Sequence, residues 1–280
     1  MNSPAFSIIC VYNDEKILND WLLESLEKQT PGFELIKIDN TGGAFKSAAE
    51  ALDHGAARAQ GEYLLFVHQD VRLLSDDWLE KAAAFLKKLP DLGIAGVGGM
   101  RKIPAAELFR LIGTSPFRSG TGIVYGGPEK APILGEMDFK EPVAVQTLDE
   151  LLLIIPASVY KNAGFDAGAC RGWHLYGADY ALSAADRGLK AYVLPLPVWH
   201  RSGGTLGREY FATLRELFKK HRGYKAISTT CGFWFASDLL NCLNLLALAL
   251  RSGIGRLLGR PNAGAEPYLR RIKLLLGGGK

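Results

Sequence analysis

Three short apolar runs near the start of the chain alternate with segments of helical periodicity, and this alternation restricts the fold more than any other feature. The runs cover Phe6–Val11, Glu34–Ile38 and Tyr63–Val67. The β-branched and aliphatic side chains of the first run are typical of a strand that is buried on both faces. Between the runs, apolar side chains recur every three or four residues, as they do along one face of a helix. Strand–helix–strand units of this kind predict an α/β fold with helices flanking the sheet.

The middle of the chain lacks this pattern. Glycine and proline recur through residues 98–146 with little apolar period, and the chain holds 32 glycines among 280 residues. We therefore expect long loops laid over the sheet there. Regular pattern returns in two predicted strands, Leu148–Ile155 and Ala191–Leu194, and in a predicted helix at Ala178–Arg187.

Charge divides the chain into two parts, which we take as a domain at 1–205 and a basic, mainly helical C-terminal extension at 206–280. The first part carries 20 Lys and Arg against 25 Asp and Glu, whereas the second carries 13 against 4. A basic tail of this kind suits a membrane surface or a phosphorylated acceptor. A solvated helical face would have the same composition, so both interpretations stay open.

Within the extension, the apolar segment Phe233–Leu250 is interrupted by Asp238, Asn241 and Asn244. It is therefore shorter than the ~20 clean apolar residues that a membrane span needs. Basic residues follow it, so we expect an interfacial helix with basic flanks in peripheral contact with a membrane. A helix packed on the body of the protein, or in a dimer interface, is the alternative. The oligomeric state stays open.

Cysteine usage points to a reducing compartment. The four cysteines form no CxxC pair, and we see no signal peptide ahead of the first strand. These features exclude a disulfide scaffold and a four-cysteine zinc site as the basis of the fold. We expect a cytoplasmic protein, peripheral at the inner face of the membrane if the extension binds lipid, and no nucleic-acid partner.

Polar side chains follow each of the first three predicted strands at the point where the strand ends. They are Tyr12-Asn13, Asp39-Asn40 and His68-Gln69-Asp70. In an open parallel sheet, ligands bind at the carboxyl ends of the strands. Carboxylates there suit a base or ribose edge and a magnesium or manganese ion that holds phosphate oxygens. The sequence therefore predicts a nucleotide site with Asp70 as the metal anchor.

Two common nucleotide-binding classes do not fit. A dinucleotide-dependent dehydrogenase needs G-x-G-x-x-G after its first strand, so that the backbone can approach the pyrophosphate. Here that strand ends in Tyr12-Asn13-Asp14-Glu15, with no glycine. A P-loop enzyme is excluded because G-x-x-x-x-G-K-[ST] does not occur in the chain.

Five ordered motifs, taken together, resemble the family 2 glycosyltransferases from about Phe6 to Thr205. The motifs are FSIICVYN, ELIKIDNTGG, ARAQGEYLLFVHQDVRLLSDDWLEK, ASVYKNAGFD and GADYALSAADRGLKAYVLPLPVWHRSGG. The resemblance implies the GT-A fold, a Rossmann-like mixed sheet flanked by helices, and transfer of a sugar from a nucleotide-diphosphate sugar. The form His68-Gln69-Asp70 in place of Asp-x-Asp looks like an offshoot of that family.

The resemblance also assigns the donor site. It implies that the nucleotide base is held near Tyr12, Asn13 and Asp39, and that the divalent metal, Mn²⁺ or Mg²⁺, is bound by Asp70 with help from His200. His68 and Gln69 would then contact the ribose. Many relatives place Arg-Asn in the helix before the third strand, where this chain has Leu52-Asp53. Lys46 could supply the missing diphosphate contact.

For the acceptor side, the resemblance makes Asp179 the catalytic base, in a Glu-Asp pair whose glutamate is replaced by Ala178. A base of this kind would deprotonate the acceptor hydroxyl as it attacks the anomeric carbon. Trp173 could offer an apolar platform for an acceptor sugar ring, or could pack in the core.

The resemblance, with these residues, implies an inverting, metal-assisted glycosyltransferase. We expect a UDP-sugar donor and, as acceptor, a saccharide of a surface polymer or a lipid-linked precursor. The main alternative is a catalytically inactive relative that keeps the fold and binds nucleotide sugar as a scaffold, since three expected residues are replaced. Nucleotidyl transfer on a similar fold is a third possibility, and it would release pyrophosphate instead of a nucleoside diphosphate.

Overall fold

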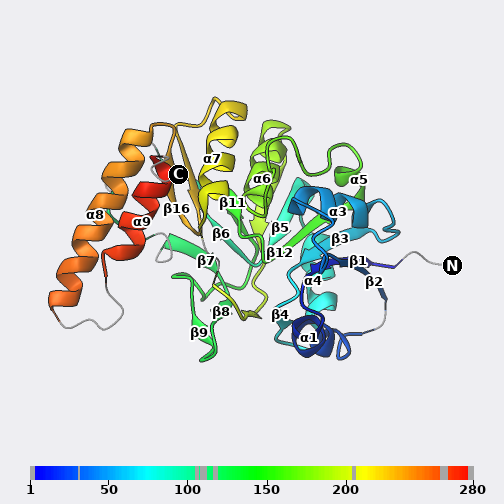
Figure 1. Ribbon diagram of the computed structural model, residues 1–280. Helices are drawn as coiled ribbons and strands as arrows, with labels where there is room; N and C mark the ends of the chain where they lie inside the picture. Colours follow the sequence, from blue (N-terminus) through cyan, green and yellow to red (C-terminus); the bar gives the residue numbers. More distant parts are fainter. Residues whose placement is uncertain are drawn as a thin grey trace.

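A seven-stranded mixed sheet forms the centre of the protein in the computed structural model (Figure 1). The structure describes residues 4–30, 32–104, 107, 112–115, 119–203, 206–258 and 264–276. The strands follow the order β10-β13-β5-β12-β3-β1-β2. Their bounds are β1 (Phe6–Tyr12), β2 (Phe33–Asp39), β3 (Tyr63–Val67), β5 (Leu92–Gly96), β10 (Val143–Val145), β12 (Leu152–Pro156) and β13 (Lys190–Val193).

The three strands predicted from the first apolar runs lie side by side. β1 pairs in parallel with both β2 and β3, so the polar residues that follow these strands meet at one edge of the sheet. β12 lies antiparallel between β3 and β5 and makes the sheet mixed. The strand predicted at Leu148–Ile155 is divided in the structure between β11 (Thr147–Leu148) and β12.

Helices cover both faces of this sheet, and the strands alternate between two hydrophobic cores. Ile9 and Phe66 face the core beneath α3 (Ala48–Ala56) and α6 (Tyr176–Asp186). Ile8, one residue earlier in the chain, faces the opposite core. This core is covered by α1 (Glu15–Ile17), the π-helical η1 (Leu18–Leu23), α2 (Glu24–Leu26) and α4 (Trp78–Leu86), while the short α5 (Ala157–Tyr160) follows β12. The period of two in the strands therefore buries both of their faces, as predicted for the first.

Residues 98–146, predicted as loops, contain short strands in the part that the structure describes, so the prediction of little regular structure there is wrong. Strands of two or three residues carry too little period to be seen in a sequence. Together with β4, β11 and β14 from outside this range, four of them form two small sheets, β11-β6-β7 and β4-β14-β8-β9, while β10 joins the central sheet. The additional bounds are β4 (Val71–Leu73), β6 (Gly98–Met100), β7 (Gly120–Gly122), β8 (Val124–Gly126), β9 (Ala131–Pro132) and β14 (Val198–His200). Gly122 has φ of +152°, and a Cβ atom there would lie 2.3 Å from the Val97 carbonyl oxygen.

The C-terminal extension consists of α7 (Arg208–Lys220), a hairpin of β15 (Ala226–Thr229) and β16 (Gly232–Phe235), α8 (Asp238–Leu257) and α9 (Glu266–Leu275). The prediction of one apolar helix from Phe233 is wrong at its start, because the first three residues belong to β16. In Figure 1, α8 and α9 stand side by side at the end of the molecule away from the N-terminus.

The extension packs on the preceding part of the chain. Phe211, Trp234 and Leu275 belong to the same buried core as Ile9. The predicted domain boundary and the end of the last motif fall at 204–205, outside the described residues. Among the described helices, none is long and apolar enough to cross a membrane.

Candidate active site

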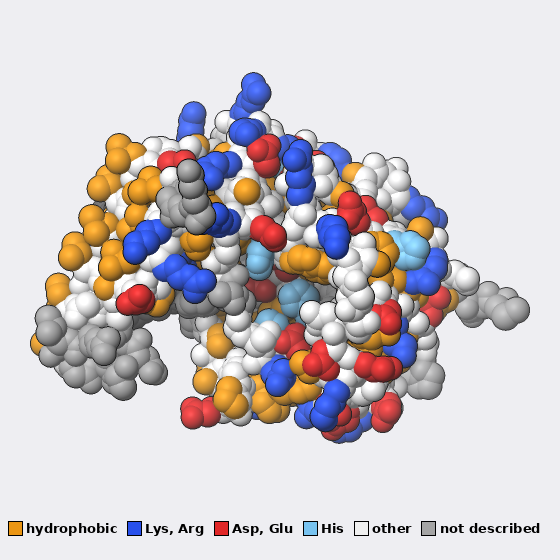
Figure 2. Space-filling view, viewed as in Figure 1, with side chains coloured by type: hydrophobic (Ala, Val, Ile, Leu, Met, Phe, Trp, Pro, Cys, Tyr) orange, Lys and Arg blue, Asp and Glu red, His pale blue; other side chains and the backbone are white. Residues whose placement is uncertain are grey.

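A cavity of about 800 Å³ opens at the edge of the sheet where β1, β2 and β3 end. In Figure 2, histidine and acidic side chains meet in the hollow near the middle of the visible face. Of the predicted site residues, Tyr12, Asn13, Lys46, His68, Gln69, Asp70 and Trp173 line this cavity. Its other lining residues include Asn40, Thr41, Phe45, His174, Tyr176, Ser202 and Glu209. The parallel strands thus bring the predicted donor residues together, although they are far apart in the sequence.

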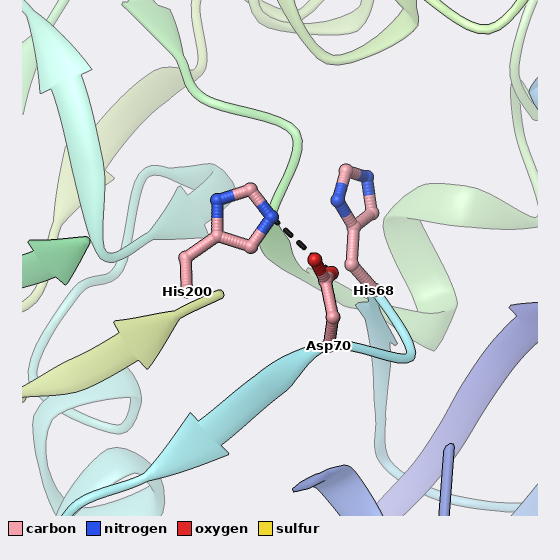
Figure 3. Close-up of side chains that lie close together, drawn as sticks. All are labelled: His68, Asp70 and His200. Carbon is pink, nitrogen blue, oxygen red and sulfur yellow. Dashed lines mark ion pairs between the residues drawn. The ribbon is translucent and has the colours of Figure 1, made fainter. Parts of the chain in front are cut away.

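His68, Asp70 and His200 form a compact cluster at the cavity (Figure 3). One ligand atom from each residue lies within 4.8 Å of the other two. His68 and Asp70 follow β3, and His200 comes from β14, which pairs antiparallel with β4 so that His200 is opposite Val71. The register of this small sheet therefore places a histidine from late in the chain beside the carboxylate that follows β3.

The Asp70 carboxylate is held in its ionised form. Ser202 donates to Oδ2 through its hydroxyl (2.6 Å) and its backbone N–H (3.1 Å), and His200 Nε2 lies 3.3 Å from Oδ1. Burial alone would raise the pKa of Asp70, but the contacts with His200 and Ser202 outweigh it and hold the pKa well below its usual range. An anionic oxygen ligand is what Mg²⁺ or Mn²⁺ requires at this position.

The two histidines suit a metal as well. Burial and the nearby His200 lower the pKa of His68 to about 4, which keeps its ring neutral and able to ligate. Nε2 of His200 is buried 3.3 Å from Asp70 Oδ1 without hydrogen-bonding geometry. Burial alone would lower the pKa of His200, but the charge of Asp70 outweighs it and raises that pKa. A buried ring nitrogen aimed at a carboxylate without a hydrogen bond fits a metal-ligating role. The donor set of two imidazoles and one carboxylate is therefore compatible with a divalent transition metal such as Mn²⁺.

Gln69 has a local role that its place in the motif does not reveal. Its Oε1 accepts from the backbone N–H groups of Asn13 (2.9 Å) and Asp14 (3.1 Å), and its Nε2 donates to Asn13 Oδ1 (2.7 Å). The side chain thereby fixes the turn after β1 against the turn after β3. This fixes the position of Tyr12 and Asn13 on the cavity wall.

The predicted base-binding residues lie at one end of the cavity. Asp39 does not line the cavity itself, and its carboxylate accepts from the backbone N–H (2.8 Å) and hydroxyl (2.7 Å) of Thr41. The bonds from Thr41 lower the pKa of Asp39. Lys46 Nζ lines the cavity and donates to the Gly43 carbonyl (2.9 Å). A mobile, exposed ammonium at this position can turn toward a diphosphate.

The opposite wall of the cavity comes from the turn before α6 and the start of α7. Trp173 is 39% exposed there, beside His174 and Glu209. The turn depends on Leu175, whose φ of +68° is unusual for a residue with a branched side chain. The Glu150 carboxylate faces this strained turn and accepts from the Gly177 backbone N–H (3.3 Å). Glu150 thus helps to hold Trp173 and His174 at the cavity.

Asp179 lies apart from the cluster of His68, Asp70 and His200. It does not belong to the cavity lining, and its side chain is only 3% exposed. One carboxylate oxygen lies 2.8 Å from Lys220 Nζ and the other 2.8 Å from His221 Nε2. The structure therefore ties Asp179 to the end of α7, and its role as base stays a prediction.

Several cavity residues were missed by the sequence analysis. Ser202 lies two residues beyond His200 in the same motif, so the motif could have revealed it. Tyr176 is the first residue of α6, just outside the last motif, and its hydroxyl lies 3.5 Å from His68 Nε2. Glu209 begins α7, and no local signal distinguishes it from an ordinary acidic residue in a first helical turn.

Comparison with known proteins places the chain among glycosyltransferases. A family model described as "Glycosyltransferase like family" matches residues 7–212. A protein of Fuscovulum blasticum called "ATP synthase subunits region ORF 6" is 27% identical over 245 residues, which are 85% of this chain and 88% of that protein.

Two solved structures share the architecture. A mannosyltransferase from Pyrobaculum calidifontis, PcManGT in complex with GDP-Man and Mn²⁺, matches 99% of this chain and 85% of its own with a TM-score of 0.50 and 15% identity. GalNAc-T7 with UDP, GalNAc and Mn²⁺ matches 78% of this chain and 48% of its own, with a TM-score of 0.51 and 12% identity. At these identities the likeness shows the fold, and it confirms the predicted GT-A architecture.

Proposed function

The chain belongs to this glycosyltransferase-like family, and on that premise we propose that it transfers a sugar from a nucleotide-diphosphate donor to an acceptor hydroxyl with inversion at the anomeric carbon. We propose UDP as the nucleotide. The observation that carries the proposal is the cluster of His68, Asp70 and His200 at the cavity into which the turns after β1 and β3 project.

The cluster residues would hold the divalent metal, with Asp70 as the anionic ligand and the two imidazoles as nitrogen ligands. Burial lowers the pKa of His200, but Asp70 outweighs it and raises that pKa, so metal binding would release a proton from this ring. When bound, the metal neutralises the charge that develops on the departing diphosphate. The protein's own groups do the rest of the work at this end of the cavity. Ser202 keeps the Asp70 carboxylate oriented, and Gln69 fixes the turn that carries Tyr12 and Asn13.

On the cavity wall, Trp173 is partly exposed and would offer an apolar face for an acceptor sugar ring. An aromatic face of this kind packs against the C–H groups of a sugar and leaves its hydroxyl groups free for polar contacts. We propose a saccharide or a lipid-linked precursor as the acceptor. The protein would then work in the cytoplasm, at the inner face of the membrane.

The acceptor hydroxyl needs a base, and two carboxylates are candidates. A base must come within hydrogen-bonding reach of the proton that it takes. Glu209 lines the cavity beside Trp173, whereas both oxygens of Asp179 are engaged by Lys220 and His221. We therefore place Glu209 first and keep Asp179 as the alternative, since Asp179 would have to leave both ion pairs before it could accept a proton.

Calorimetric titration of UDP and GDP, with and without Mn²⁺, tests the proposal. We expect UDP to bind in a metal-dependent manner to the native protein. Asp70→Ala should remove this binding, because it removes the anionic ligand. Asp76→Ala, at an exposed position outside the cavity, is the matched control and should bind as the native protein does.

Failure of the native protein to bind either nucleotide would overturn the proposal. Binding of UDP-sugars without release of UDP in the presence of saccharide or lipid-linked acceptors would support the inactive scaffold instead. Release of pyrophosphate would identify nucleotidyl transfer. Metal-dependent binding of GDP instead of UDP would change the proposed donor to a GDP-sugar and would leave the proposed metal site unchanged.

A further inference from the structure

The exposed apolar side chains of this protein gather on one helical pair. Nine large apolar side chains are exposed in the described residues, and eight of them lie on or directly after α8 and α9. The ninth, Trp173, belongs to the cavity. The eight are Leu239, Leu243, Leu246, Leu250, Ile254, Leu258, Leu269 and Leu276. Isolated exposed leucines are common on protein surfaces, but a contiguous group of this size marks an interaction surface.

Six of these residues, Leu239 to Leu258, follow one another at intervals of three or four along α8 and form a single stripe. The spacing places all six on the same face of the helix. Their exposed fractions run from 44% at Leu246 to 74% at Leu258. At the helical rise of 1.5 Å per residue, the stripe is about 28 Å long. We call these six residues the α8 stripe.

Two asparagines of α8 point the other way, into the protein. Asn241 and Asn244 are 1% and 2% exposed. Asn241 accepts from the Phe235 backbone N–H (2.7 Å) and donates to its carbonyl (2.9 Å). Asn244 donates to the Phe233 carbonyl (3.1 Å) and accepts from the Gly113 N–H (2.8 Å). The asparagines that interrupt the apolar segment in the sequence therefore satisfy buried backbone groups, and the outward face is left apolar.

Basic side chains accompany the stripe. Residues 238–276 contain six Lys and Arg against two Asp and Glu. Arg270 and Lys273 on α9 are exposed, whereas Arg251 on α8 donates to the Gly113 carbonyl (2.9 Å). Figure 2 shows apolar side chains over the outer side of α8 and Lys and Arg side chains gathered beside them, over α9. An apolar stripe bordered by cations is complementary to a surface that is apolar inside and anionic at its rim.

We propose that α8 docks on an anionic lipid surface, with the α8 stripe in the acyl–headgroup boundary and Arg270 and Lys273 of α9 at the phosphates. Burial of the leucines supplies the apolar part of the binding energy, and each nearby cation adds to it in a salt-dependent manner. The surface uses no residue of the cavity, so this inference stands apart from the proposed reaction.

Flotation of the full-length protein with vesicles tests the proposal. We expect binding to phosphatidylcholine vesicles that contain a quarter of phosphatidylglycerol, and binding at least about tenfold weaker to pure phosphatidylcholine or at high salt. Native protein that stays unbound with the anionic vesicles would overturn the proposal. So would a light-scattering mass showing a stable dimer that does not bind vesicles, because a second copy would then cover the stripe.

Substitutions separate the apolar contribution to vesicle binding from the electrostatic contribution. The triple variant Leu243→Gln, Leu246→Gln and Leu250→Gln changes exposed positions, and we expect it to lose about tenfold or more of the vesicle affinity. Arg270→Gln with Lys273→Gln should lose most of the preference for anionic vesicles. The control, Lys87→Gln with Lys88→Gln, removes the same charge after α4 and should bind as the native protein does.

The cavity offers an internal check on folding, since each variant should retain the metal-dependent nucleotide titration of the native protein. If the leucine variant keeps that titration and also keeps full vesicle affinity, the α8 stripe is not the docking surface.

Discussion

Two buried carboxylates of this protein each contact a histidine ring, yet their surroundings differ. Asp70 is accompanied by His200, His68 and Ser202 at the wall of the cavity. Asp179 is enclosed between Lys220 and His221, away from the cavity. In the first cluster a ring nitrogen is left without a hydrogen bond, whereas in the second both carboxylate oxygens are engaged.

This difference shows that contact with a histidine does not by itself reveal the role of a carboxylate. A cluster with an unsatisfied buried ligand atom is arranged for a group that arrives from outside. A cluster with all its atoms paired is arranged to join two elements, here α6 to the end of α7. In the sequence, both aspartates lie in motifs that resemble the family 2 glycosyltransferases. Only their neighbours in the structure distinguish the two carboxylates.

The largest expected effect concerns the base. Glu209→Gln keeps the size of the side chain and removes its ability to accept a proton, so turnover with UDP-sugar and acceptor should fall by about 10²–10⁴-fold. UDP binding measured by calorimetry should be unchanged, because Glu209 lies at the acceptor end. Asp179→Asn is the matched comparison, and we expect it to retain turnover in the fraction of protein that stays folded.

If instead the asparagine variant is folded and inactive while Glu209→Gln is active, the assignment reverses. The cluster around Asp179 would then be catalytic, and the contrast between the two carboxylates would disappear.

The next effect separates the two histidines. His200→Ala removes a ring from the metal cluster, and we expect Mn²⁺ affinity to fall by at least about 10–100-fold, the loss that follows even from removing an outer partner of a ligand. The melting temperature should fall less than in His221→Ala, because Ser202 still donates twice to the Asp70 carboxylate. Isothermal titration of Mn²⁺ and thermal unfolding, made on the same samples, measure both quantities.

His221→Ala should do the opposite. It leaves the Asp179 carboxylate buried with only Lys220, so we expect about 1–3 kcal/mol of lost stability and native Mn²⁺ affinity. Equal effects of the two substitutions on Mn²⁺ affinity would show that the clusters do not divide the two roles in this way.

The smallest effect comes from a third carboxylate, Glu150. It accepts a hydrogen bond from the Gly177 backbone N–H instead of from a histidine or a cation. Burial and the negative charge of Asp149 raise the pKa of Glu150 from 4.5 to about 8. The folded protein therefore keeps this proton while the unfolded chain releases it, so the contribution is fully present below the ordinary pKa and is lost as pH rises toward 8.

Glu150→Gln is uncharged at every pH and removes that dependence. Relative to the native protein, the variant should become more stable as pH rises from about 5 to about 8. Urea unfolding of both proteins across this pH range measures the difference between their free energies of unfolding. The titration of other groups contributes equally to both proteins and cancels in this difference. A difference that does not vary with pH would show that Glu150 is ionised in the folded state.

Much of the fold could be predicted from the chain itself. The strands β1, β2, β3 and β13 and the helix α6 lie within a few residues of their predicted bounds, because each is long enough to show its period. The short strands of residues 98–146 and the start of α8 were not predicted. The position of a strand of two or three residues depends on partners that are distant in the sequence.

The candidate site divides in the same manner. Tyr12, Asn13, His68, Gln69 and Asp70 follow strands that run in parallel, and parallel strands end at one edge, so their meeting was predictable from order alone. Glu209 comes from a helix more than a hundred residues later, and only the packing of α7 brings it to the cavity.

The sequence by itself determined the alternation of strands and helices and the polar residues at the strand ends, since both are local patterns of side chains. The tertiary structure decided which carboxylate faces the cavity, which is tied down by ion pairs, and that the asparagines of α8 point inward while its leucines face outward. Those outcomes depend on neighbours supplied by other elements, and the free energy of a polar or apolar group is set by what surrounds it.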